Sequence, residues 1–338
     1  MKRKRVSFVT LFVLVLFALI SCSENPIEVV EKPPCPPSQI VSIAPYDSPI
    51  WHPSDDIIGF NYTPLDSITY PYGGHCMGVQ HFNYDSTGFW LIKSDGTNKR
   101  RVLPFKLQTP SWSNDGKWIA FVMGAQIYKM PFINGEFDTT NIVQLTTKGS
   151  NFFPTWSPDG KWIAYDQSIC KNANSCGVLI MNKDGEDKRF ISEYSRMPNW
   201  HPSGQRLTFI NRAVLEGGEV IGDSLWEYDI INNKRKLIVQ LTGTNYDNRY
   251  PKYSPKNNIL AFSSNDNSGE PSQIWIIDLL NNDIKQLTYK GIADGFSWSP
   301  NGNKIVFTQN TKNWHANNGT LCIIDIHTSY EKQLTYNF

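Results

Sequence analysis

The sequence lacks the catalytic motifs of several common enzyme classes. It contains no G-x-S-x-G nucleophile elbow, no H-E-x-x-H pair and no P-loop. These absences exclude an α/β-hydrolase nucleophile, a zincin centre and phosphate binding by a Walker-type loop. We therefore expect a protein that is not an enzyme and that holds no cofactor, and we assign no catalytic residue.

The chain also lacks an excess of charge of either sign. Its 32 Lys and Arg residues balance 31 Asp and Glu residues, for a formal net charge of +1. No block of like charge stands out, so we expect no nucleic-acid partner and no basic face for binding a membrane. Beyond the N-terminus, no apolar run approaches the length of a membrane span.

The first 21 residues have the order of a bacterial secretory signal. "MKRKR" precedes an apolar run from Val6 to Ile20, which at about fifteen residues is short for a membrane span. The run ends in "LISC", which resembles the lipobox of bacterial lipoproteins. That resemblance implies cleavage before Cys22 and acylation of this residue, for example by palmitate. An ordinary cleaved signal with an incidental cysteine is the alternative.

We accordingly expect residues 1–21 to be removed as a signal peptide and Cys22 to anchor the protein in the bacterial cell envelope, in the outer membrane. Residues 22–37 contain "PPCPP". Such a proline-rich stretch favours an extended tether. The sequence leaves open whether the anchored protein lies in the periplasm or at the cell surface.

A repeated frame occupies the rest of the chain, residues 38–338. It is spelled "PIWHPSDDIIGF", "PSWSNDGKWIAF", "PTWSPDGKWIAY", "PNWHPSGQRLTF", "PKYSPKNNILAF" and "FSWSPNGNKIVF". The third position is aromatic each time, as Trp51, Trp112, Trp156, Trp200, Tyr253 and Trp298. Three of the five intervals between these residues are about 44 residues long, the length of one four-stranded propeller blade.

Each frame continues with an apolar run and a polar hairpin. Four units then end in "QLT", at Gln144, Gln240, Gln286 and Gln333. Runs that are apolar on both faces are typical of sheets covered on both sides, and "SPDG" from Ser157 favours a type I turn. The sequence therefore predicts an all-β fold, a six-bladed β-propeller of four-stranded antiparallel blades with the frame aromatics in its core.

The frame is similar to the TolB-like, PD40-type (WD40-like) propeller repeats, which run "PxWSPDGxxIAF" followed later by "QLT". The resemblance covers residues 38–338 and implies a propeller that acts as a binding module or as the non-catalytic part of a peptidase. TolB itself carries an α/β domain before its propeller, and residues 23–37 are too few to form one. The role of TolB in the Tol–Pal system is therefore not carried over.

Closure of the ring has two interpretations. Ser38 to Ser42, "SQIVS", precede Trp51 at the spacing at which "QLT" precedes Trp156 and Trp298. This segment could supply the outermost strand of the last blade. The C-terminal "QLTYNF" could supply the same strand, and the sequence does not choose between them.

The candidate partner site lies on the connections between blades. With the strands of a blade lettered A to D from the axis outward, the B–C connections vary most in length, and the D–A connections reach the same face near the channel. Arg and Tyr are typical of hot spots for a protein or peptide partner. The candidate binding residues are Asp47, Phe152, Arg196, Arg249, Tyr250 and Asp294. The alternative is that Phe152 and Tyr250 only fill the channel mouth.

Two other functional classes stay open at this point. A propeller lyase or glycosidase could use His75, His81, Asp47 or Asp294. A polysaccharide-binding module could stack sugars on its aromatic side chains, and the candidates are Trp314 beside His315, Tyr70 and Tyr72. We favour the protein- or peptide-binding scaffold because the loops of one face are elaborated and no catalytic set is found.

Histidine and cysteine residues give weaker signals. His75, Cys76 and His81 are soft or borderline metal ligands, but their spacing matches no motif and a fourth ligand is not evident, so no metal site is assigned. His52 and His201 take the serine position of the frame and are interpreted as turn variants.

In an oxidising envelope Cys170 and Cys176 are predicted to pair. Cys35 with Cys76 is a weaker second pair, and Cys322 is predicted to be a buried thiol in a core strand.

Overall fold

The computed structural model describes residues 46–54, 56–69, 79–169, 176–214, 220–239, 249–265, 272–310 and 319–335. The chain divides into two compact units, and the propeller belongs to the unit made of Gln39–Ile68 and Gln80–Phe338. The predicted signal, the lipidated Cys22 and the tether lie outside the described residues, so they stay predictions.

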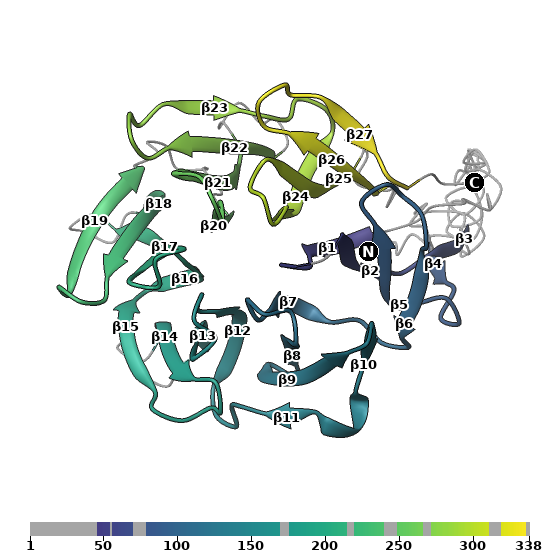
Figure 1. Ribbon diagram of the computed structural model, residues 1–338, viewed down its shortest axis with the longest axis horizontal. Coiled ribbons are helices and arrows are strands. Elements are labelled where there is room, and N and C mark those ends of the chain that lie inside the picture. Colours follow the sequence, from purple (N-terminus) through teal and green to yellow (C-terminus); the bar gives the residue numbers. More distant parts are fainter. Residues whose placement is uncertain are drawn as a thin grey trace, which may run out of the picture. The chain divides into compact units, whose positions relative to one another are not determined.

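Six antiparallel sheets follow one another around a ring, each built from one continuous stretch of chain (Figure 1). Their strands are β1 (Tyr46–Trp51), β2 (Ile57–Tyr62), β5 (Gly88–Lys93) and β6 (Arg100–Leu103) in blade 1; β7 (Gln108–Trp112), β8 (Trp118–Met123), β9 (Gln126–Ile133), β10 (Glu136–Phe137) and β11 (Val143–Gln144) in blade 2; β12 (Ser150–Trp156), β13 (Trp162–Ile169), β14 (Gly177–Asn182) and β15 (Arg189–Glu193) in blade 3; β16 (Ser195–Trp200), β17 (Arg206–Val214), β18 (Val220–Asp229) and β19 (Lys234–Val239) in blade 4; β20 (Arg249–Tyr253), β21 (Ile259–Ser264), β22 (Gln273–Asp278) and β23 (Ile284–Gln286) in blade 5; and β24 (Ile292–Trp298), β25 (Lys304–Asn310), β26 (Thr320–Asp325) and β27 (Glu331–Gln333) in blade 6. The predicted six-bladed propeller is confirmed.

Blade 2 departs from the four-stranded pattern at its outer edge. Two short strands, β10 and β11, both pair with β9, and a single 3-10 turn, η1 (Thr139–Asn141), separates them. Its N-cap is Asp138, whose side chain accepts a hydrogen bond from the backbone N–H of Thr140. The strands β3 (Leu65–Thr69) and β4 (Val79–Phe82) form a separate two-stranded sheet.

The hydrophobic core lies between neighbouring blades, as the two-sided apolar runs predict. Trp156, for example, is 8% exposed and packs among Val122 and Ile127 of blade 2 and Ile163 and Tyr165 of blade 3. All six frame aromatics are buried in this way. Because a blade can cover its faces only with another blade, closure of the ring is what buries the frame.

The "SPDG" turn of blade 3 satisfies its own polar groups. The Ser157 hydroxyl donates to Asp159 at 2.6 Å and accepts the backbone N–H of Trp162 at 2.9 Å. Asp159 also accepts the N–H of Lys161. Partial burial raises the pKa of Asp159, but these hydrogen bonds lower it more, and the carboxyl ends below its usual range. The turn is held without help from a neighbouring blade.

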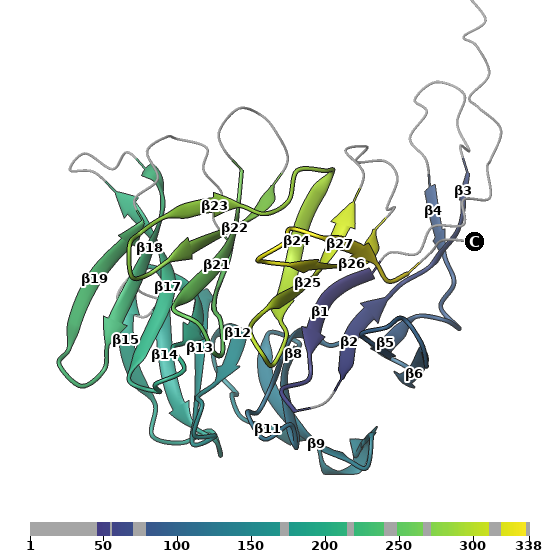
Figure 2. The same ribbon diagram turned by 45° about the horizontal axis from the view of Figure 1, so that its top comes forward.

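The ring closes by packing of blade 1 against blade 6. The outermost strand of blade 6, β27, comes from the C-terminus, and β1 lies beside β24 and β25 (Figure 2). The backbone N–H of Trp51 donates to the Ser297 hydroxyl at 3.0 Å across this junction. Of the two interpretations of closure, the C-terminal strand is therefore the one found, and "SQIVS" lies outside the described residues.

Candidate functional site: the central channel

Every innermost strand carries the same backbone irregularity. In each blade the pairing of strands A and B shifts register within the four residues that precede the frame aromatic. One residue per blade there has a positive φ, and these residues are Ser48, Thr109, Phe153, Met197, Tyr250 and Gly295. Five of them are not glycine. A bulge of this kind adds a residue and re-aims the side chains that follow it, and backbone strain of this sort clusters at functional sites.

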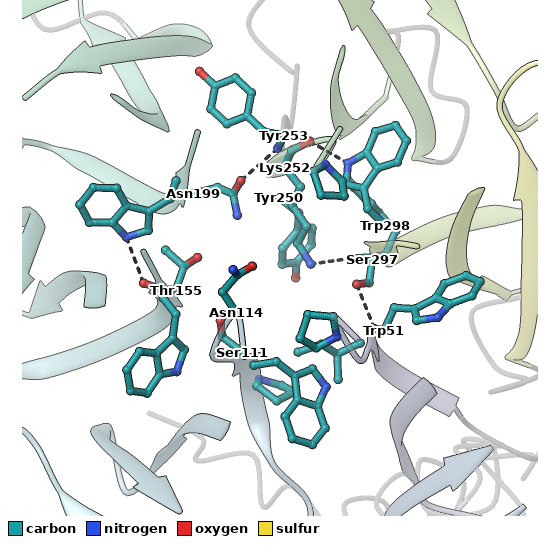
Figure 3. Close-up of a pocket in the computed structure, with 18 of the residues that line it drawn as sticks. Trp51, Ser111, Asn114, Thr155, Asn199, Tyr250, Lys252, Tyr253, Ser297 and Trp298 are labelled. Carbon is teal, nitrogen blue, oxygen red and sulfur yellow. Dashed lines mark hydrogen bonds between the residues drawn. The ribbon is translucent and has the colours of Figure 1, made fainter. Parts of the chain in front are cut away.

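The bulges line a central cavity of about 880 Å³ with matching residues of all six blades. The cavity extends from the positive-φ residues to the turns between strands A and B, so it lies at the end of the channel where strand A finishes. The residue just before each frame aromatic lines this wall, namely Ile50, Ser111, Thr155, Asn199, Lys252 and Ser297 (Figure 3). We call these six residues the channel ring.

Prolines form much of the cavity wall. They are Pro49, Pro53, Pro110, Pro154, Pro158, Pro198, Pro202, Pro251, Pro255 and Pro300. Proline fixes φ and has no backbone N–H. The wall is therefore stiff, and the polar groups that face the cavity come mainly from the side chains of the channel ring and the turns.

Hydrogen bonds between blades orient two members of the channel ring. The side-chain oxygen of Asn199 accepts the backbone N–H of Tyr253 at 3.0 Å, and the Ser297 hydroxyl accepts that of Trp51. Because the oxygen of the Asn199 amide is bound to Tyr253, its NH2 group points away from Tyr253. The Ser297 hydroxyl accepts one hydrogen bond and still carries a proton that it can donate. Figure 3 shows the Asn199 amide nitrogen directed toward the middle of the cavity.

Two lysine side chains belong to the described lining of the cavity. Lys252 is half-buried in the channel ring, and Lys256 is exposed on the following turn. None of the described residues that line the cavity is Asp or Glu. With its hydroxyls and amides, this lining is suited to bind an anionic or polar ligand.

A polar cluster supports the wall between blades 4 and 5. The Tyr253 hydroxyl donates to the buried Glu227 carboxylate at 2.6 Å. The Arg206 guanidinium donates to both oxygens of the same carboxylate at 3.1 Å. The His201 ring packs edge-on against the Tyr253 ring, with 4.8 Å between the ring centres. Burial and the Glu227 charge raise the pKa of Tyr253, so its hydroxyl stays protonated. Burial and the Arg206 charge lower the pKa of His201. His201 therefore takes the serine place in its turn, as predicted, and also packs on the next blade.

A second buried titratable group, Asp166, belongs to strand β13 of blade 3. The Asp166 carboxyl is 3% exposed and accepts the backbone N–H of Met197, a residue that lines the cavity, at 2.9 Å. Burial raises the pKa of Asp166 to about 7, although the Met197 N–H and the Arg196 charge act to lower it. The Asp166 carboxyl thus holds one residue of the cavity wall through a hydrogen bond.

The six predicted partner-binding residues have different surroundings in the structure. Tyr250 lines the cavity and meets the Phe153 ring at 5.9 Å. Asp47 accepts from Asn61 at 2.7 Å and pairs with Lys106 at 3.2 Å, while Phe152 packs against the core beside Trp156. These two and Arg196 are not among the residues that line the cavity.

The last two of the six predicted residues belong to innermost strands. Arg249 begins β20 and Asp294 lies within β24, and the structure describes no side chain for either. Each of the five predicted residues other than Tyr250 stands one position before a positive-φ residue that lines the cavity. Their role in binding stays a prediction.

The cysteine and histidine predictions have mixed outcomes. Cys322 is 1% exposed and free, which confirms the buried thiol, and burial raises its pKa to about 11. Cys176 is disulfide-bonded, whereas its predicted partner Cys170 lies outside the described residues. His81 is exposed on β4. Cys35, Tyr70, Tyr72, His75, Cys76, Trp314 and His315 also lie outside the described residues.

The described residues contain no group of three or more His, Cys, Asp or Glu residues arranged to hold a metal ion. Within that part of the chain, no helix has the length and apolar character needed to cross a membrane.

The channel ring was not singled out from sequence, although a signal for it exists. Within the frame, the position before the aromatic is one of those that change chemical class from repeat to repeat, as Ile, Ser, Thr, Asn, Lys and Ser. A variable position between two nearly constant ones marks a site that the fold does not fix. Lys252 in "PKYSPK" could have been found in this way.

Comparison with known proteins supports the fold. No protein-family model matches the chain. Among solved structures it is similar to a putative TolB from Agrobacterium tumefaciens (TM-score 0.57, 18% identity, over 70% of this chain and 84% of that one). It is also similar to TolB from Acinetobacter baumannii (0.56, 16%, 85% and 79%) and to an oligogalacturonate lyase in complex with manganese (0.51, 11%, 85% and 92%). The chain thus has the β-propeller fold of TolB and related proteins.

Proposed function

We propose that the protein is a binding propeller of the bacterial cell envelope, which takes a peptide segment of a partner protein into its central cavity. The observation that carries this proposal is the channel ring. Six repeats keep the residues that pack blades together, and they vary at the position that lines the cavity. Variation at a position that faces a cavity, directly beside positions kept for packing, is typical of a binding site in a repeat protein.

The chemistry of the cavity favours binding over catalysis. Its polar groups are hydroxyls, amides and ammonium groups, and no described lining residue is a carboxylate, histidine or cysteine that could act as general base or nucleophile. The Tyr253 hydroxyl already donates to Glu227, which raises its pKa. The resemblance to TolB propellers adds support at the level of fold. Anchoring through Cys22 and the disulfide of Cys176 suit the cell envelope, and the anchor is part of the proposal.

Site-directed photocrosslinking in the native envelope tests this proposal. A photoreactive phenylalanine would replace Asn114 at the cavity, Tyr289 in the D–A connection before blade 6, or Tyr330 in the outer hairpin of blade 6. All three are exposed, and the tyrosines are 71% and 69% exposed, so the replacements should not disturb folding. We expect one partner protein to be captured from Asn114 and not from Tyr330.

Capture from Tyr289 alone would contradict binding in the cavity and would place the partner at the D–A connections instead. Equal capture from all three positions would indicate non-specific contact and would also contradict the proposal. Mass spectrometry of the crosslinked peptide would identify the segment that enters the cavity.

A further inference from the structure

The six positive-φ residues that line the cavity differ in size between two halves of the ring. Blades 3, 4 and 5 carry large side chains with apolar surface, namely Phe153, Met197 and Tyr250. Blades 6, 1 and 2 carry small residues at the same position, namely Gly295, Ser48 and Thr109. We call the three large residues the apolar arc. Because the three blades of each group are consecutive, the apolar arc faces the small residues across the channel.

The backbone at this position favours glycine over a large side chain. The φ angle is 51° at Phe153, 54° at Met197 and 55° at Tyr250, in a region where bulky residues are outliers. A proline follows each of them, and proline favours an extended conformation for the residue before it. Blade 6 has Gly295 here, with a φ of 50°. The fold therefore does not require bulk at this position, and strained residues of this kind cluster at functional sites.

Contacts between blades fix the arrangement of the apolar arc. The Asp166 carboxyl of blade 3 accepts the backbone N–H of Met197 at 2.9 Å. The Met197 sulfur accepts the backbone N–H of Tyr250 at 3.4 Å. The Tyr250 ring packs edge-on against the Phe153 ring of blade 3, with 5.9 Å between the ring centres. The contacts thus run from blade 3 through blades 4 and 5 and back to blade 3.

Part of the apolar arc stays exposed to the cavity. Its three residues are half-buried, although Met197 packs on the core between blades 4 and 5 and Tyr250 on the core between blades 5 and 6. Figure 3 shows the Tyr250 ring among the side chains that reach the middle of the cavity. The small residues opposite occupy less of the channel, so open volume lies on their side. An apolar surface beside open volume is suited to bury an apolar group.

We infer that the apolar arc and the space opposite it form a subsite for one large apolar side chain of the bound peptide. This inference rests on the proposed function, because the peptide character of the ligand comes from there. Aromatic rings offer a large contact area with few rotatable bonds, and methionine adapts its shape to the group beside it. The channel ring then meets polar groups of the peptide, and the apolar arc selects the side chain that enters.

The test is selection from a random heptapeptide library, displayed on phage, by the purified protein. We expect the enriched peptides to share one large apolar residue at a fixed position. The most enriched peptide is then synthesised, and its affinity is measured by calorimetry. Replacing its shared apolar residue by glutamine should weaken binding by about tenfold or more, because burial of that side chain against the apolar arc is lost.

Two substitutions alter the subsite from opposite sides. Phe153→Ala removes part of the apolar arc, so it should weaken binding of the most enriched peptide by about tenfold, and a new selection should favour a bulkier apolar residue. Ser48→Phe gives blade 1 the residue that blade 3 carries in the same conformation, and by filling the open side it should abolish binding.

Phe190→Ala is the matched control, because it removes a phenylalanine that is 45% exposed on β15, the outer strand of blade 3. It should leave binding and selection unchanged. Thermal unfolding curves would establish that each variant is folded. If Ser48→Phe does not fold, Phe153→Ala carries the test.

The outcomes separate this inference from the proposed function. Enriched peptides that share no apolar residue would overturn the subsite and leave the peptide scaffold standing. Unchanged binding by the folded channel variants would show that the apolar arc only fills the channel, and would also overturn the subsite. Failure of the parent protein to enrich any peptide would overturn the subsite together with the proposed function.

Discussion

Blades 3 and 5 have the same backbone but different polar chemistry. Both innermost strands shift register before the frame aromatic, and both second strands place an alanine opposite the channel-ring residue. In blade 3 the aromatic is Trp156 and the turn is closed by Ser157 and Asp159. In blade 5 the aromatic is Tyr253, and the turn reaches across to blade 6, where Asn257 donates to the Gly302 carbonyl at 3.1 Å.

The comparison distinguishes the residues of a repeat that pack the blades from the residues that make specific contacts. Blade 3 agrees with the frame almost everywhere, and the Ser157 hydroxyl of its turn bonds to Asp159 of the same turn. Blade 5 departs from the frame where it faces the cavity, with lysine at positions 252 and 256, and its turn bonds to blade 6 through Asn257. Agreement with the repeat thus indicates packing, and departure from it indicates a specific contact.

The largest expected effect is the loss of the blade 3 aromatic. Trp156→Ala should destabilise the protein by about 3–5 kcal/mol, because a buried side chain between blades 2 and 3 leaves a cavity that the stiff interface cannot fill. Urea unfolding followed by tryptophan fluorescence would measure the change. A loss below about 1 kcal/mol would contradict the role of the frame aromatic as core.

The matched change in blade 5 probes a hydrogen bond. Tyr253→Phe keeps the ring but removes the hydroxyl that donates to Glu227, and Glu227 keeps only Arg206 as a charged partner. We expect a loss of about 2 kcal/mol, because a buried acceptor is left short of a donor. The control is Tyr228→Phe, whose hydroxyl bonds exposed Asn233 and whose loss should be near zero. Equal effects of the two variants would refute the buried network.

A pH experiment tests the buried Asp166 of blade 3, whose place in blade 5 is taken by the uncharged Ser263. Because the folded protein raises the pKa of Asp166 from 3.8 to about 7, its contribution to stability is complete below pH 3.8 and is lost as the pH rises through about 7. We expect the unfolding free energy to fall by about 2 kcal/mol between pH 5 and 8 on this account.

Asp166→Asn keeps an acceptor for the Met197 N–H and should remove most of this slope. Unfolding free energies measured across the pH range would test the prediction. An unchanged slope in the variant would assign the pH dependence to other groups.

The smallest expected effect concerns the turns. Asp159→Ala removes the acceptor for Ser157 and Lys161 and should cost about 1 kcal/mol, whereas Lys256→Ala at the corresponding place in blade 5 should leave stability nearly unchanged. Melting temperatures of the two variants would show the contrast. If Lys256→Ala were the more destabilising change, Lys256 would be a structural residue rather than a binding one.

The sequence predicts the fold well for a physical reason. Each blade must bury both faces, so selection for packing repeats the same aromatic, aliphatic and turn residues six times, as Trp156 and Ile163 illustrate. The cavity was harder to predict because its lining depends on the bulge, which turns Lys252 and Asn199 into the channel, and a bulge of this kind has no strong residue signature. The D–A residues are predicted from chemical type alone, and among those whose side chains the structure describes only Tyr250 lines the cavity.

Competition at the crosslinking site tests the central claim most directly. The photoreactive residue at Asn114 would be activated in native envelopes with increasing amounts of a synthetic peptide that has the sequence of the crosslinked partner segment. We predict that this peptide suppresses capture of the partner at concentrations that saturate the purified protein, and that a peptide of the same composition in scrambled order does not. Undiminished capture at a saturating concentration of the peptide would show that the partner does not use the cavity, and would contradict the account.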